Sequence, residues 1–171
     1  MEGKDKGNQF IRTHNQVPEE NKVKSELPED IMYVTGCDLK QALKWAETHC
    51  NMLSFYAVLF AQGLIDMSYR TFFKLSLKDG WSNERGYIDW EKEDVLKKLN
   101  IKKKIVKYSH PKDIDGDKFY QVLLTNKHGK HFIFGYKENG VAKYSDTNYR
   151  GIDVQTFQLG DKILWAKTLE D

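Results

Sequence analysis

The spacing of apolar and polar positions divides the chain into a helical first half and a β-rich second half. From Asp38 to about Thr48, apolar residues recur three and four positions apart, which predicts an amphipathic helix. The next segment, CNMLSFYAVLFAQG, is apolar on every side and ends in a glycine, which is typical of a helix buried in a core. We expect a third helix from Ser68 to about Lys78 and a fourth after Asp89, because serine and aspartate cap helix N-termini.

The second half predicts an antiparallel sheet. Short runs rich in β-branched and aromatic residues are separated by turn sequences such as Asp115-Gly116 and Asn139-Gly140. These runs span 103–109, 118–125, 131–136, 141–146 and 162–167. Helices followed by hairpins favour an α+β fold, in which the buried helix lies across a C-terminal antiparallel sheet of about five strands.

The domain organisation follows from composition. Residues 1–36 mix charges with glycine, asparagine and proline and show little periodicity, so we expect a flexible polar N-terminal arm there. A chain of 171 residues with 40% hydrophobic side chains is long enough for one core, which assigns 37–171 to a single domain.

Charge and hydropathy narrow the classes of partner and compartment. A formal net charge of +2 gives little long-range attraction to nucleic acid, and no apolar run is long enough to cross a membrane. We therefore expect neither nucleic acid nor a membrane as a partner. The first residues lack the apolar segment of a signal peptide, which favours a cytoplasmic location. Two cysteines, Cys37 and Cys50, favour reduced thiols over a disulfide framework. No cofactor motif is found, and His128 with His131 alone is weak support for a metal.

Candidate chemistry begins with Cys50, at the start of the buried helix, where the helix dipole favours a thiolate. A hairpin with Asn139-Gly140 as a two-residue turn would place His131 and Asp146 diagonally on one sheet face, whereas a three-residue loop would separate them. The shared face also carries the small residue Gly135, which would let a helix approach. Cysteine, histidine and aspartate together form a nucleophile, a base and an orienting group.

The order of these motifs resembles a known family. Cys50 with its apolar helix, the loop GWSNERGYIDW, and the strands HFIFGY and VAKYSD are similar to papain-like cysteine peptidases. Within them, the chain resembles the group of bacterial and phage domains that includes the peptidases of double-glycine leader peptides, over roughly residues 38–168. The resemblance implies a papain-like fold and a hydrolase acting on a peptide or isopeptide bond of a peptide or protein substrate. It also implies Cys50 as nucleophile, His131 as base and Asp146 as orienting group. The chain departs from the family at one position. The family has a glutamine there that helps to bind the oxyanion, whereas this chain has Lys44, and its nearest glutamine, Gln41, lies about one helical turn earlier.

Other interpretations remain open at this stage. Lys44 favours a catalytically inactive papain-like module that binds a peptide or protein partner, and an acyltransferase or deamidase would use the same triad. Cys50 could instead be a buried small side chain, and Cys37, which also precedes a helix, could be the nucleophile. His131 could be a strand-end residue and Asp146 a turn residue.

Overall fold

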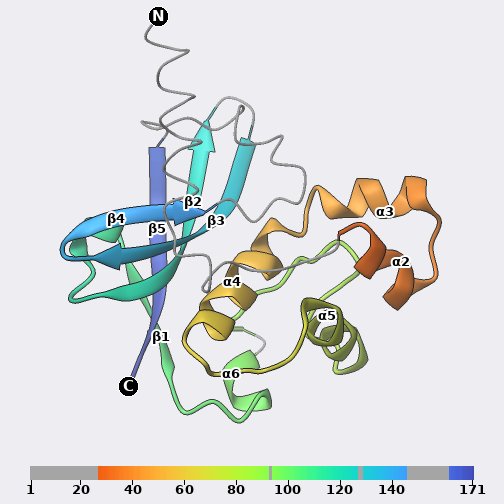
Figure 1. Ribbon diagram of the computed structural model, residues 1–171, viewed down its shortest axis with the longest axis horizontal. Helices are drawn as coiled ribbons and strands as arrows, with labels where there is room; N and C mark the ends of the chain where they lie inside the picture. The colour runs from red at the N-terminus through yellow and green to blue at the C-terminus, as the bar shows by residue number, and fades with distance from the viewer. Residues whose placement is uncertain (1–26, 93, 127–128, 146–161) are drawn as a thin grey trace, which may run out of the picture.

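The computed structural model describes residues 27–92, 94–126, 129–145 and 162–171, and they form helices followed by a five-stranded sheet (Figure 1). The helices are α2 (Glu29–Thr35), α3 (Leu39–Ala46), α4 (Cys50–Ala61), α5 (Tyr69–Lys78) and α6 (Val95–Lys98). The strands are β1 (Lys104–Tyr108), β2 (Lys118–Asn126), β3 (Gly129–Glu138), β4 (Val141–Ser145) and β5 (Lys162–Glu170), with a 3-10 turn, η2 (Pro111–Asp113), before β2. The order β1-β5-β2-β3-β4 is antiparallel throughout, so the predicted α+β class and sheet are confirmed.

Two predicted helix starts are confirmed by their caps. The carboxylate of Asp38 accepts a hydrogen bond from the backbone N–H of Gln41 at 2.8 Å. The hydroxyl of Ser68 accepts one from the N–H of Thr71 at 3.1 Å. Each cap satisfies an N–H group that has no partner inside its helix, which is why these residue types begin helices.

The predicted fourth helix is much shorter than expected. Asp89 accepts a hydrogen bond from the N–H of Lys92 at 3.0 Å, as a cap would, but the regular helix α6 starts only at Val95. Asp94 has a left-handed backbone, with φ of 53°, and an α-helix cannot continue through that conformation.

The range assigned to a polar arm contains a helix that the sequence analysis missed. Helix α2 buries Ile31 completely, and Leu27 just before it is also part of the core. The apolar residues of this helix form one short consecutive run, IMYV, after two acids, and such a run gives too little periodicity to predict seven helical residues. Residues 27–36 therefore belong to the folded part of the chain and not to a polar arm. Residues 1–26, the rest of the proposed arm, lie outside the described residues.

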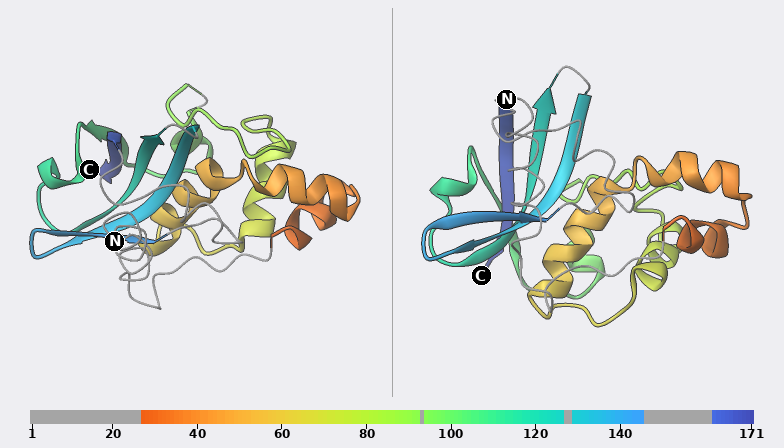
Figure 2. Two further views of the ribbon diagram at one scale, coloured as in Figure 1. Left: turned by 90° about the horizontal axis from the view of Figure 1, so that it is seen from above. Right: turned by 45° about the horizontal axis from the view of Figure 1, so that its top comes forward.

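Helix α4 is the centre of the molecule. It lies between the sheet and the group formed by α2, α3 and α5 (Figures 1 and 2). Every residue from Met52 to Leu59 is buried, which explains why the segment is apolar on all sides. None of the helices in the described ranges is long and apolar enough to span a bilayer.

The two faces of the sheet are distinguished by the pairing of β2 with β3. Gln121 pairs with Phe134, and the side-chain amide of Gln121 donates a hydrogen bond to the hydroxyl of Ser54 in α4 at 2.8 Å. Because side chains alternate along a strand, this face is the one covered by α4. The opposite face carries a second apolar cluster that includes Val122 and Ile133.

The hairpin between β3 and β4 has the predicted turn, but the sheet face that we expected to lie against α4 points away from it. Gly135 pairs with Tyr144, as expected for a two-residue Asn139-Gly140 turn, whose residues both have positive φ. However, Gly135 lies on the face away from α4. A Cβ atom there would stand 2.5 Å from the ring of Tyr120, so the glycine makes room for that tyrosine and not for a helix. The expected approach of a helix to this face is therefore wrong.

Candidate functional site at the first turn of helix α4

Cys50 is placed as the sequence predicted, as the first residue of the buried helix. Its side chain is half-buried, and both it and Cys37 are free thiols. Ser54, one helical turn later, accepts a hydrogen bond from Gln121 of the sheet. Because residues four positions apart lie on the same side of a helix, Cys50 lies on the same side of α4 as this contact, one turn nearer the N-terminus. An accessible thiol at the N-terminus of a buried helix is a reasonable place for reactive chemistry.

His131 lies on the other side of the sheet. It pairs with Leu124 of β2, and Leu124 belongs to the apolar cluster on the face away from α4. Only 1% of the His131 surface is exposed. The register therefore does not bring His131 to the face of Cys50, contrary to our expectation. Because the side-chain period of a strand is two, assigning α4 to the wrong face reversed the direction of the histidine. Asp146, the expected orienting residue, lies outside the described residues.

A different histidine, His49, forms the structural centre of the site. It is fully buried, with Nδ1 2.6 Å from the Tyr69 hydroxyl and Nε2 2.8 Å from the Glu84 carbonyl oxygen. A carbonyl oxygen only accepts, so Nε2 carries the proton and Nδ1 accepts from the tyrosine. Burial lowers the pKa of His49 to about 4, and burial also raises the pKa of Tyr69 well above its ordinary value. His49 is therefore neutral near pH 7, and neither nitrogen is available as a base for Cys50.

The loop after α5 is fastened to the first turn of α4. The Thr48 hydroxyl donates to the Arg85 carbonyl oxygen at 2.6 Å, and the Asn51 amide donates to the Ile88 carbonyl oxygen at 3.0 Å. Gly86, with φ of 74°, lies directly against His49. Because these contacts come from three residues within one turn, Thr48, His49 and Asn51, the loop and the start of α4 are held together at several points.

Gln121 joins the start of α4 to the sheet. Its amide nitrogen lies 3.0 Å from the Asn51 carbonyl oxygen and 3.1 Å from the Asn51 side-chain oxygen, in addition to its bond with Ser54. Sequence reasoning missed this residue, although an amide in the middle of the apolar stretch FYQVLL of β2 was a usable signal. Buried polar side chains need hydrogen-bond partners, so Gln121 fixes how α4 sits on β2.

A cleft, which we call the α4 cleft, opens beside this loop and the start of α4. Its volume is about 560 Å³, within the range of ligand-binding sites. Phe132 contributes from β3 on the α4 face, and Tyr87 in the loop is 48% exposed. The residues that line it are Asn51, Gly80, Trp81, Ser82, Asn83, Tyr87, Ile88, Asp89 and Phe132.

Two further hypotheses from the sequence concern an oxyanion-binding residue and a metal site. Lys44, which the sequence resemblance aligned with an oxyanion glutamine, is an exposed residue in the last turn of α3. Among the residues that the structure describes, no cluster of three or more histidine, cysteine or acidic side chains could hold a metal ion.

Comparisons with known proteins do not assign this site. No family model, no curated protein and no solved structure matches the chain. Its function is therefore inferred from its own residues.

Proposed function

We propose that this chain is a papain-like α+β module that binds a peptide or protein segment in the α4 cleft without cleaving it. The position of His131 carries this proposal. A thiol peptidase needs an imidazole close to its sulfur, and the register directs His131 to the opposite face of the sheet from α4. His49, the neighbour of Cys50 in sequence, has both ring nitrogens engaged. Neither of these two imidazoles is therefore placed to serve Cys50 as a general base.

The lining of the α4 cleft supports binding of an extended polypeptide. The exposed side chain of Asn83 offers its NH2 group to a peptide backbone, since its Oδ1 atom already accepts from the N–H groups of Arg85 and Tyr87. Asn51 and Ser82 are bonded within the protein and shape the polar wall of the cleft. Tyr87 and Phe132 provide aromatic surface, which contributes much of the free energy of binding at protein interfaces. The loop is held in place by α4 before any ligand arrives, so little ordering entropy opposes binding.

The cleft can be tested with peptides of defined sequence. Twelve-residue peptides would be selected from a random display library against the full-length chain, synthesised, and measured by isothermal titration calorimetry. We expect Tyr87→Ala to weaken their binding about tenfold, the loss typical of an exposed aromatic anchor. Tyr33→Ala is the matched control, because Tyr33 is another exposed tyrosine, 67% exposed on α2 and outside the cleft. Failure to select any peptide, or equal losses in the two variants, would refute binding in this cleft.

A cysteine peptidase is the second candidate, and the place of Cys50 favours it. At the N-terminus of a buried helix, the thiolate that attacks carbonyls is favoured. In this alternative, Cys50 attacks a peptide or isopeptide carbonyl carbon, the leaving amine takes a proton from an imidazole, and water hydrolyses the resulting thioester. Acyl transfer or deamidation would differ only in the attacking or leaving group. All three require His131 to act on Cys50, which the binding proposal does not.

A further inference from the structure

A second cleft lies between α6, the segment before it and the beginning of β1, and we call it the α6 cleft. Its volume is about 490 Å³. Its apolar part comes from the buried Trp90 and Leu96 and the half-buried Ile101 and Ile105. The residues that line it are Trp90, Glu91, Asp94, Leu96, Lys97, Asn100, Ile101, Lys102, Lys103, Lys104 and Ile105.

The charged residues of the α6 cleft are mostly lysines. Among the described residues that line it, four are lysines and two are acids, and one of these acids, Glu91, is paired with Lys167 of β5 at 3.0 Å. Lys103 is paired with Asp171 at 2.6 Å. Lys97 and Lys102 are exposed and form no ion pair with any residue in the described ranges. The cleft therefore combines an apolar surface with cationic groups that are open to a ligand.

We propose that the α6 cleft binds a small amphipathic anion, with a carboxylate or phosphate head and an apolar body. Lysine ammonium groups form strong, charge-assisted hydrogen bonds with such heads. The body would cover Ile101 and Ile105, whose surfaces are partly exposed to water. The site is separate from the peptide-binding function proposed above and does not depend on it, since none of its lining residues lines the α4 cleft.

Decanoate is a suitable probe, used with the full-length chain below its micellar concentration. Decanol and acetate serve as matched ligands, the first lacking the charge and the second lacking the apolar body. Calorimetry should detect saturable binding of decanoate only, weakened by added salt because the charges are near the surface. Decyl phosphate should also bind, since the proposal covers both kinds of head. Equal binding of decanol and decanoate, or no binding of decanoate at millimolar concentrations, would overturn the proposal.

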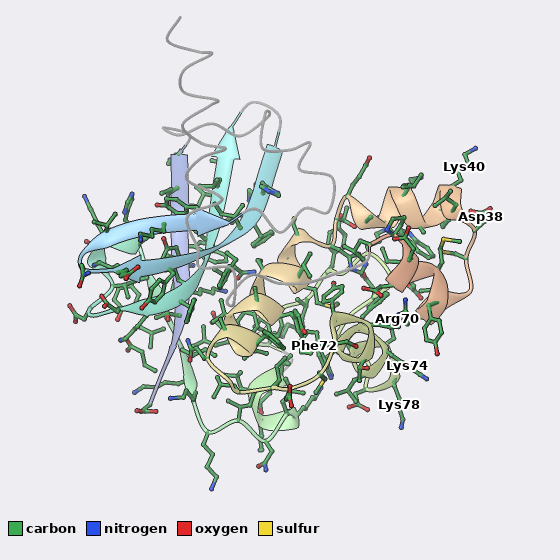
Figure 3. The ribbon with its side chains drawn as sticks, viewed as in Figure 1. Asp38, Lys40, Arg70, Phe72, Lys74 and Lys78 are labelled. Atoms are coloured by element: carbon green, nitrogen blue, oxygen red, sulfur yellow. The ribbon has the colours of Figure 1, made fainter. Side chains whose placement is uncertain are left out.

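Charge reversal locates the site. The double variant Lys97→Glu/Lys102→Glu should weaken decanoate binding at least tenfold, because a hydrogen bond to a charged group is worth about that much. Lys40→Glu is the control: Lys40 is exposed on α3, on the other side of the molecule from α6 (Figure 3). Circular dichroism would verify that both variants are folded. If Lys40→Glu lost as much decanoate affinity for each charge reversed as the double variant does, decanoate binding would depend on the net charge of the protein and not on this cleft.

Discussion

Gly86→Ala should destabilise the protein by about 3 kcal/mol more than Gly80→Ala does. Both glycines have left-handed backbones, with φ of 74° and 75°, so both variants share the strain of an alanine in that region. They differ in what a new methyl group meets. At Gly80 nothing lies within 4 Å, whereas at Gly86 the Cβ atom would stand 2.8 Å from Cγ of His49. His49 cannot retreat without losing its two buried hydrogen bonds, so the methyl must displace the loop or break them.

Urea denaturation of the two variants measures this difference directly. The loop that carries Gly86 also carries Tyr87 of the α4 cleft, so we expect Gly86→Ala to lose affinity for the selected peptides as well. Equal stability of Gly80→Ala and Gly86→Ala would mean that the loop does not rest on His49.

Acidification should cost the protein about 2.5 kcal/mol of stability through His49 alone between pH 7.5 and pH 4.5. The unfolded histidine titrates near pH 6.5, but in the folded state burial lowers its pKa to about 4. Between these values the unfolded chain binds more protons than the folded one, so stability falls as the pH falls from about 6.5 towards 4. The size follows from about 1.4 kcal/mol for each pKa unit.

The variant His49→Gln isolates this contribution. Glutamine does not titrate, so the variant should be less stable at pH 7.5 but should lose less stability between pH 7.5 and 4.5 than the parent chain. His110→Gln is the comparison variant, since burial lowers the pKa of His110 in the same direction, but this side chain is only half-buried and its replacement should change the pH dependence less than His49→Gln does. If the parent chain and His49→Gln have the same pH dependence of their urea midpoints, His49 is not buried in its neutral form.

Most of the fold could be predicted because its signals are local. The apolar period of α4, the caps Asp38 and Ser68, and the Asn139-Gly140 turn each involve a few neighbouring residues. Helix α2 was missed because its burial depends on contacts with α3 and α5, which lie later in the chain. The length of α6 was overestimated because the left-handed backbone of Asp94 cannot be recognised from the sequence around it.

The site was only partly predictable because its geometry depends on which sheet face α4 covers. The local pattern correctly placed Cys50 at a helix start and correctly set the register of the β3–β4 hairpin. The small size of Gly135 suggested a helix on its face, yet Tyr120 of the neighbouring strand fills that space. The amide of Gln121 was the better indicator, since a buried polar residue on the α4 face needs partners from α4.

The most direct test of the central claim is the rate at which iodoacetamide alkylates Cys50 between pH 5 and pH 9, with and without His131. Mass spectrometry would follow Cys50 and Cys37 separately, so that Cys37 reports any general loosening of the fold. Because His131 is buried, His131→Gln would be measured beside His131→Ala to separate loss of the imidazole from loss of packing. We predict that the pH profile of Cys50 keeps its midpoint in both variants. A midpoint at least one pH unit higher in both variants, with Cys37 unchanged, would contradict the account and identify Cys50 and His131 as a catalytic pair.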